Sequence, residues 1–374
     1  MTGDPIVVWR TVAFCAATFL AGCAVPPHRS RPSRLGPTRT NRVQAAYANL
    51  RPALAEWDLE TYGRDCLLLY EEKEEWLLGC SEMAGKSGFE ATGEVWDAHA
   101  ILWNEPALTL SEKHLPYENI KLSMVGTVGT HKDEKGGAPN PVLIIQEWDA
   151  LHKNHPGFQD APIEEWLGVF VHEAFHARQM WHPQVRAVIT RWDEPNRPVT
   201  GDDLASFYTL NEGFRAALHA EFALLEAATG GPQLPPIEAR RVLADWLRLY
   251  RARERAFGPA LEAAFPGRDA WFMDGFETFL EGSARYVESK FLISPQPVTL
   301  GSLNNEPTYR HFEQSLGKGP AQLPGLGKPG SKYFYALGMH LCHLLDSADP
   351  AWKSRVFESD RLLIGQVERA SAGL

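Results

Sequence analysis

Apolar and polar positions are patterned differently along the two parts of the chain, and the first part has the pattern of strands. The apolar runs Leu67–Tyr70 and Trp76–Leu78 flank a charged segment, which predicts a β-hairpin. Further strands are expected at Glu94–Trp103, Ile120–Thr130 and Val142–Trp148. Residues 43–57 predict a short helix interrupted at Pro52, because proline removes a backbone donor inside a helix. This part therefore predicts a small mixed sheet.

From about residue 160 onward the apolar residues recur with helical spacing. Helices are expected at 161–181, 202–229, 236–257, 269–291, 331–347 and 350–371. A Gly/Pro-rich loop, either a flexible lid or a connector, occupies 317–331. Strands followed by helices with short connections are typical of an α+β fold. We expect a mixed α/β part at 43–159 and a helical part at 160–374.

Residues 1–23 have the layout of an export signal. Arg10 precedes an apolar run that is too short for a comfortable transmembrane span. The segment Leu20-Ala21-Gly22-Cys23 resembles the lipobox of bacterial lipoproteins. That resemblance implies a lipoprotein signal peptide, cleavage before Cys23, a lipid anchor on its thiol, and attachment to the cell envelope at the outer membrane. An ordinary signal with an incidental cysteine is the alternative.

Residues 24–42 contain four prolines, five arginines and no acidic residue. A stretch of this composition is expected to form an extended tether. The whole chain has 44% hydrophobic residues and a net charge of −10. The hydrophobic content is enough for a sizeable core and excludes a disordered chain. The acidic balance is unlike that of nucleic-acid-binding proteins, so we expect no nucleic acid as a partner.

Cysteines beyond the signal are Cys66, Cys80 and Cys342. The first two flank the expected hairpin, which would bring them roughly opposite each other. Because export permits disulfides, a Cys66–Cys80 bridge is a hypothesis. Cys342 is then expected to be an unpaired, buried apolar residue.

One pentapeptide carries the chemistry: His172-Glu173-Ala174-Phe175-His176. Two histidines four residues apart on a helix point the same way, so both imidazoles can reach one metal ion. Glu173 would then be placed to take a proton from water at the metal. The helix is expected to stop near His182, since Pro183 disfavours helix there. The alternative is an amphipathic helix whose histidines lie on its polar face.

A hydrolytic zinc site needs a third protein ligand. The helix near 269–291 carries an acidic stripe that includes Glu281-Gly282-Ser283-Ala284-Arg285-Tyr286 and Glu288. Here the chain resembles the gluzincin metallopeptidases, in which a glutamate in an E-G-x-A-x-Y setting completes the HExxH site. The resemblance implies a zincin-like fold, one zinc ion bound by His172, His176 and Glu281, and Glu173 as general base. A stripe of acids on a solvated helix face is the simpler alternative.

Two other acids could be the third ligand. Glu277 lies one turn before Glu281, which would then orient the ligand from behind. Glu212 lies in Asn211-Glu212-Gly213-Phe214, which is similar to a motif of gluzincin aminopeptidases, although Arg215 stands where a small residue is expected.

The expected function is that of a zinc-dependent peptidase, acting on a peptide or protein substrate and anchored to the envelope. The developing oxyanion needs a donor besides the metal, and Tyr335 in Tyr333-Phe334-Tyr335 is the candidate, with simple aromatic packing as the alternative. Two other functions stay open. One is a non-catalytic envelope lipoprotein whose metal joins two helices, and the other is an interaction protein without metal.

Overall fold

The structure, a computed structural model, describes residues 33–372 except 64, 82–83, 85–87, 105–125, 132–139, 192–196, 295–299, 312–317 and 324–325. The expected signal peptide with Cys23, the beginning of the expected tether and most of the strand expected at Ile120–Thr130 lie outside the described residues. None of the helices found in these residues is long and apolar enough to cross a membrane.

The described residues form two compact units. The first comprises residues up to Gln44 and from Asp65 to Trp166, and the second comprises Ala45–Gly63 and the residues from Leu167 onward. This division differs from the single boundary expected near residue 160. The difference arises because two helices, α1 (Gly36–Glu56) and α3 (Ile163–Gln179), each contribute residues to both units.

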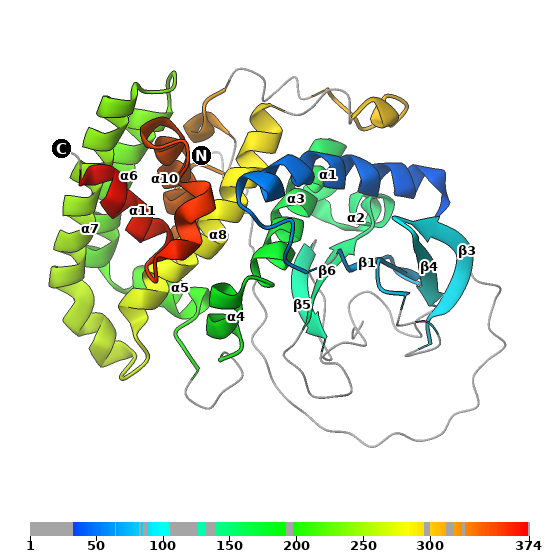
Figure 1. Ribbon diagram of the computed structural model, residues 1–374, viewed down its shortest axis with the longest axis horizontal. Helices are drawn as coiled ribbons and strands as arrows, with labels where there is room; N and C mark the ends of the chain where they lie inside the picture. Colours follow the sequence, from blue (N-terminus) through cyan, green and yellow to red (C-terminus); the bar gives the residue numbers. More distant parts are fainter. Residues whose placement is uncertain are drawn as a thin grey trace. The chain divides into compact units, whose positions relative to one another are not determined.

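The first unit contains the small mixed sheet that the sequence predicts. Its strands are β1 (Leu67–Tyr70), β2 (Glu75–Leu78), β3 (Glu90–Trp96), β4 (His99–Asn104), β5 (Gly126–His131) and β6 (Asn140–Gln146). They lie in the order β3-β4-β2-β1-β6-β5 (Figure 1). Strands β1 and β6 run parallel, and the other neighbouring pairs run antiparallel. The short helix α2 (Trp148–Asn154) follows β6.

The expected β1–β2 hairpin is confirmed, whereas the single strand expected at Glu94–Trp103 is wrong. In its place β3 and β4 form a second hairpin, in which Trp96 pairs with His99. The two residues of its turn, Asp97 and Ala98, have φ of 47° and 65°. Such a turn matches the twist of the flanking strands but normally uses Asn-Gly or Asp-Gly. An alanine at the second position therefore gave no turn signal.

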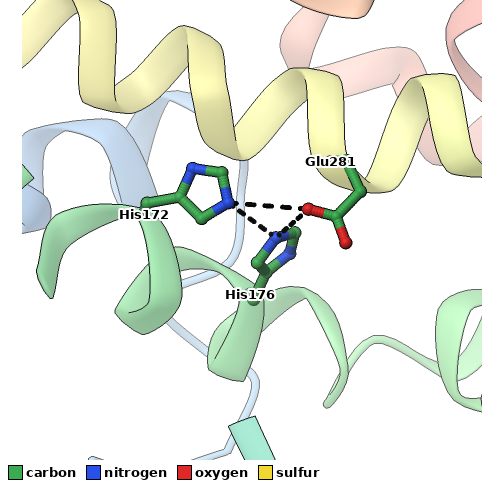
Figure 2. Close-up of side chains that lie close together, drawn as sticks. All are labelled: His172, His176 and Glu281. Carbon is green, nitrogen blue, oxygen red and sulfur yellow. Dashed lines mark hydrogen bonds and ion pairs between the residues drawn. The ribbon is translucent and has the colours of Figure 1, made fainter. Parts of the chain in front are cut away.

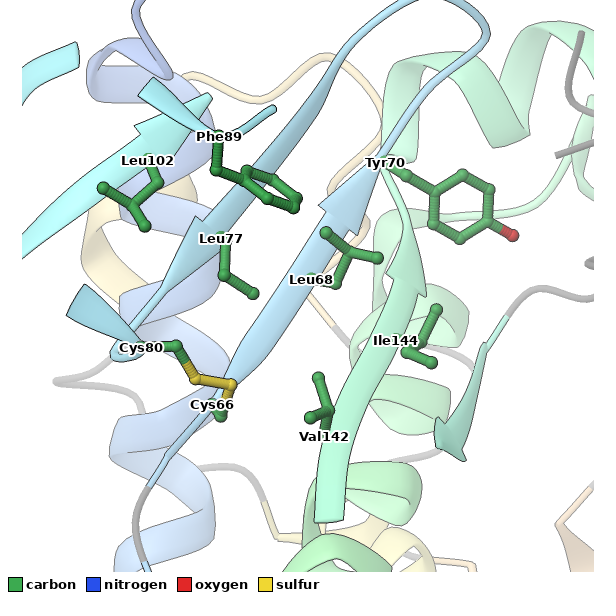
Figure 3. Packing of buried hydrophobic residues seen from close by; sticks show 9 residues of the cluster. All are labelled: Cys66, Leu68, Tyr70, Leu77, Cys80, Phe89, Leu102, Val142 and Ile144. Atoms are coloured by element: carbon green, nitrogen blue, oxygen red, sulfur yellow. A yellow bond between two sulfur atoms is a disulfide. The ribbon is translucent and has the colours of Figure 1, made fainter. Parts of the chain in front are cut away.

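A disulfide joins the two strands of the first hairpin. Cys66 precedes β1, Cys80 follows β2, and their Cα atoms are 5.4 Å apart, which confirms the expected bridge. The disulfide belongs to a buried cluster shown in Figure 3, whose other members are Leu68, Tyr70, Leu77, Phe89, Leu102, Val142 and Ile144. These residues come from neighbouring strands and cover one face of the sheet.

Helix α1 corrects two expectations. It begins at Gly36, inside the stretch 24–42 that was expected to be a tether, and it continues past Pro52 without a break. The arginine of that stretch nearest the fold, Arg42, is buried and donates hydrogen bonds to Glu147 at 2.7 Å and Asp149 at 2.9 Å. These two acids lie at the start of α2. Arg42 is therefore ion-paired inside the first unit instead of being exposed to solvent as part of a tether.

The second unit is helical. Besides parts of α1 and α3 it contains α4 (Pro183–Ile189), α5 (Gly201–Leu210), α6 (Glu212–Thr229), α7 (Pro236–Ala264), α8 (Ala270–Ile293), α10 (Phe334–Ala348) and α11 (Leu362–Ser371). Short 3₁₀ turns lie at Pro156–Phe158 in the first unit and at Gly301–Leu303, Pro320–Gln322 and Lys353–Glu358 in the second. Helices α6, α7, α8, α10 and α11 pack together as a bundle (Figure 1).

Two expected helix boundaries are wrong for local reasons. The helix expected at 202–229 is two helices, because Asn211 is extended and its side chain accepts a hydrogen bond from the Phe214 amide at 3.0 Å, which caps α6. The helix expected at 350–371 is a 3₁₀ turn followed by α11. Helix α3 ends at Gln179, slightly before the stop expected near His182, and Pro183 begins α4, where proline fits the first turn.

Helices α8 and α10 of the second unit cross in close contact. The contact is made by Gly282 and Gly338, whose backbones face each other with no room for a side chain. A Cβ atom on Gly282 would lie 2.9 Å from the carbonyl carbon of Gly338, and a Cβ atom on Gly338 would lie 3.1 Å from the carbonyl carbon of Thr278. Both glycines are therefore required for the helices to approach this closely.

Polar contacts further along the same two helices hold the crossing. Ser289 of α8 lies 2.8 Å from the Nε2 atom of His343, and Tyr286 donates a hydrogen bond to Asp346. Lys353 donates to the same carboxylate at 2.7 Å. Burial lowers the pKa of His343 from its ordinary value of 6.5 to about 3, so this histidine is neutral in the folded protein. Cys342 beside it is unpaired and buried, as expected.

We predict that Gly338→Ala destabilises the protein by roughly 1–3 kcal/mol, because the methyl group overpacks the helix crossing. Gly275 of α8, the other helix of the crossing, is the matched control, since a Cβ atom there makes only ordinary contacts, the nearest being 3.4 Å from Ile364 Cγ1. Gly275→Ala is expected to change stability by no more than about 1 kcal/mol, and helix propensity favours the alanine. Urea unfolding of the two variants measures both effects. Equal behaviour of the two would contradict the crossing described above.

A second prediction concerns acid. As the pH falls below 6.5, the unfolded chain protonates His343 while the folded chain does so only near pH 3, so stability is lost in this window. His343→Gln should lose less stability between pH 6.5 and pH 5 than the parent, by as much as about 1.4 kcal/mol per pH unit. His219→Gln, at an exposed position, is the control. Identical pH profiles for His343→Gln and the parent would refute the assignment.

Candidate metal centre

The two histidines of the HExxH segment lie on α3, in its part within the second unit. His172 and His176 are 5% and 3% exposed. The apolar face of the helix holds them in place: Phe175 packs edge-on against Trp57 at 5.3 Å, and Trp57 also contacts Phe279 of α8 at 6.4 Å. Trp57 thus keeps α3 and α8 at a fixed distance from each other.

The histidine side chains meet Glu281 of α8 (Figure 2). The Nε2 atoms of His172 and His176 are 3.1 Å apart, and Glu281 Oε2 lies 3.0 Å from His176 Nε2 and 3.6 Å from His172 Nε2. Two ligands at about 2.0–2.1 Å from a tetrahedral ion lie roughly 3.3 Å apart. The three observed separations are close to this value, so the group could hold a metal ion.

Hydrogen bonds on the far side of each ring fix which nitrogen faces the shared space. His172 Nδ1 donates to Glu288 Oε2 at 3.1 Å, and His176 Nδ1 donates to Gln179 Oε1 at 3.0 Å. Gln179 in turn donates to Ser283 Oγ at 2.7 Å. With both protons on Nδ1, the two Nε2 lone pairs point at Glu281, which is the arrangement found around bound metal ions.

The Nε2 atoms of His172 and His176 and the carboxylate of Glu281 lie so close together that a positive charge between them is needed to offset their repulsion. Burial lowers the pKa of His172, but hydrogen bonds that the protonated ring donates to Glu281 and Glu288 outweigh burial and raise that pKa to about 9. Burial raises the pKa of Glu281, but His176 and His172 outweigh it and hold that pKa well below its ordinary value. The electrostatics of the site therefore favour a cation, and a divalent ion satisfies all three donors at once.

Glu173 is partly buried beside the group without belonging to it. Burial raises its pKa, with His172 and His176 acting in the opposite direction, and the net shift is upward. A carboxylate whose pKa lies above its ordinary value is a better proton acceptor than a solvated one. Glu173 therefore has the position and the basicity to exchange a proton at this site.

Tyr335, in the first turn of α10, lies next to the same group. Its ring stacks on that of His172 with a centroid separation of 5.8 Å and an angle of 14°. Burial, the charge of Glu281 and a hydrogen bond to Glu281 hold the pKa of Tyr335 well above its ordinary value. Its hydroxyl is therefore a protonated donor at neutral pH.

The other two candidate ligands lie elsewhere. Glu277 is buried one turn before Glu281 and accepts a hydrogen bond from the Gly201 amide at 2.9 Å, at the start of α5. Burial and the neighbouring Glu281 raise the pKa of Glu277 to about 8. Glu212 is exposed in the first turn of α6. The structure brings neither of them into the group of His172, His176 and Glu281.

Sequence reasoning missed the partners of the ligands. Glu288 was noted only as the last acid of a stripe, and Gln179 was not considered. The only available signal for Gln179 is its position three residues after His176, which puts it on the same helix face. Nothing in the spacing distinguishes the carboxylate that faces the two Nε2 atoms from the one that faces the back of a histidine.

No protein-family model, curated protein or solved structure matches this chain.

The geometry predicts that Glu281→Gln lowers metal occupancy sharply, because an amide oxygen is a weaker ligand than a carboxylate. Glu277→Gln, one turn away on the same helix, is the matched control and should keep the metal. Elemental analysis of protein purified without chelator, with thermal unfolding before and after added metal, measures both. Metal loss in the Glu277 variant, with retention in the Glu281 variant, would reverse the assignment.

Proposed function

We propose that the protein is a zinc-dependent peptidase of gluzincin type with a zincin-like fold. The observation that carries this proposal is the meeting of His172, His176 and Glu281, with Glu173 beside them. Each of the three residues offers one ligand atom. Catalytic zinc sites have three protein ligands, whereas structural zinc sites have four. Histidine nitrogens with a carboxylate suit zinc better than magnesium or calcium, which prefer oxygen ligands alone.

A zinc ion in this position would polarise a substrate carbonyl and make water more acidic. Glu173 is the group that accepts the proton of the attacking water and later passes it to the leaving amine. Its raised pKa suits both steps, because the same carboxylate must first take up and then give away a proton. In this role Glu173 must be ionised before the water attacks. A divalent cation nearby would favour the ionised form of its carboxylate.

Tyr335 is the donor for the oxyanion that forms from the carbonyl oxygen. Its hydroxyl is hydrogen-bonded to Glu281 and would turn from that carboxylate to the oxyanion, while stacking on His172 restricts its ring. A ring that is already held in place needs only this small rotation as charge develops. Glu288 and Gln179 keep the two imidazoles oriented during the same step.

The remaining parts of the proposal rest on the sequence alone. The lipobox ending at Cys23 supports a lipid anchor in the cell envelope, with a peptide or protein as substrate. A disulfide between Cys66 and Cys80 agrees with an exported protein, because such bonds persist in oxidising compartments. A metal that merely joins α3 and α8 is the rival function, and it gives no role to Glu173.

Glu173→Gln separates the two functions. In the peptidase, this variant keeps about one zinc per chain and loses hydrolysis by roughly 100-fold or more, because the general base is absent. Release of fluorescence from a quenched-peptide library, with zinc content measured on the same samples, provides both readouts. Parent and variant that hydrolyse the library equally would refute the role of Glu173. A zinc-loaded parent without any hydrolysis would favour the structural metal.

A further inference from the structure

Arg285 lies on α8, one turn after Glu281, and its side chain is 12% exposed. Its guanidinium carbon is 5.1 Å from the centre of the Tyr335 ring. Its Nη1 atom donates to Glu288 Oε2 at 2.9 Å, the same oxygen that accepts the hydrogen bond from His172. Arg285 is thus part of the wall of the candidate metal centre.

The other edge of this guanidinium has no partner among the described residues. Nε is buried and makes no hydrogen bond, and the structure records none from Nη2. Buried donors in folded proteins are almost always paired, so an unpaired one beside the candidate metal centre points to a missing partner such as a bound ligand. Nε and Nη2 together form the planar fork that binds the two oxygens of a carboxylate.

The position of this fork limits where the carboxylate sits on a substrate. Arg285 Nη1 lies 2.9 Å from Glu288 Oε2, and that oxygen lies 3.1 Å from Nδ1 of His172. One carboxylate oxygen and one imidazole ring therefore separate the guanidinium from the candidate ligand atoms, a span of about two residues of an extended peptide at about 3.3–3.6 Å per residue. At that distance a free C-terminus supplies a carboxylate in any peptide sequence, whereas an Asp or Glu side chain does so only in some.

Charge is compatible with such a ligand. The carboxylates of Glu173, Glu281 and Glu288 are balanced by the guanidinium together with a divalent ion, so the site has no excess negative charge to repel an anion. The cation of Arg285 over the Tyr335 ring also keeps the fork from swinging away.

We propose that Arg285 binds the C-terminal carboxylate of the substrate, which makes the protein a peptidase that removes one or two residues from a free C-terminus. This inference rests on the proposed function for the site of cleavage. The binding of a carboxylate is nevertheless measurable without any hydrolysis.

The test uses the full zinc-loaded chain carrying Glu173→Gln, so that peptides stay intact. The probes are two N-acetylated tripeptides of alanine and phenylalanine, identical except that one ends in a carboxylate and the other in an amide. Isothermal titration should give roughly 10- to 100-fold tighter binding of the acid, as expected for a charged, forked hydrogen bond. Arg285→Gln should abolish the difference, and Arg285→Lys should keep only part of it.

Lys290→Gln is the matched control, because it removes the same charge from the same helix at a half-exposed position. It should leave the preference for the acid unchanged. Circular dichroism and zinc content establish that each variant is folded and loaded. Equal binding of the two peptides, no binding of either, or a preference that survives Arg285→Gln would each overturn the inference.

Failure of the inference and failure of the proposed function give different results. If Arg285 only positions Tyr335 and Glu288, its variants weaken acid and amide peptides to the same extent while the parent remains an active peptidase. If the proposed function is wrong but the fork binds carboxylate, the acid preference persists in a parent that hydrolyses nothing.

Discussion

The candidate site depends on the close crossing of α8 and α10 at Gly282 and Gly338. Glu281 immediately precedes the first glycine, and Tyr335 lies one turn before the second, so the crossing determines how the carboxylate and the phenol meet. Side chains at either position would push the helices apart and separate the two groups. The apolar face of α3 then needs only to pack against Trp57 for its histidines to reach Glu281. The relative positions of Glu281 and Tyr335 are therefore set by backbone contact between the two helices.

Three glutamates follow one another along the buried face of α8, and each is stabilised differently. Glu277 accepts the first amide of α5, Glu281 faces two imidazoles, and Glu288 lies between Arg285 and the back of His172. A buried carboxylate without a partner is very costly, so the partner decides what each one can do. Their pKa values separate accordingly: that of Glu277 rises, while those of Glu281 and Glu288 fall. The residue type is the same in all three cases, so the difference comes from the partners.

This explains how far the sequence could be interpreted. The spacing of His172 and His176 predicts a shared face on a helix, because that spacing is a property of one helix. The close approach of α8 and α10 at Gly282 was not predicted, because it depends on a second helix far along the chain. The prediction that Arg42 lies in an extended tether was wrong. A Pro/Arg-rich stretch has the composition of a tether, and the buried partner Glu147 lies far away in the sequence. The turn at Asp97 and the break at Asn211 were missed for a related reason. At both positions the residue types are compatible with more than one backbone conformation. The neighbouring strands fix the turn at Asp97, and the cap by its own side chain fixes the break at Asn211.

The two histidines differ in the group behind them, and this difference bears on how the proposed zinc would behave. A carboxylate behind an imidazole makes it a stronger ligand than an amide does, because it stabilises positive charge on the ring. His172 has Glu288 behind it, whereas His176 has only Gln179 and, beyond it, Ser283. Arg285 withdraws part of the charge of Glu288 and lowers the pKa of that carboxylate, after burial has raised it. The guanidinium therefore acts on His172 through Glu288 and is in contact with the ring of Tyr335. A substrate carboxylate on Nε and Nη2 would weaken the hold of Arg285 on Glu288, so His172 would be a still stronger ligand when the substrate is bound.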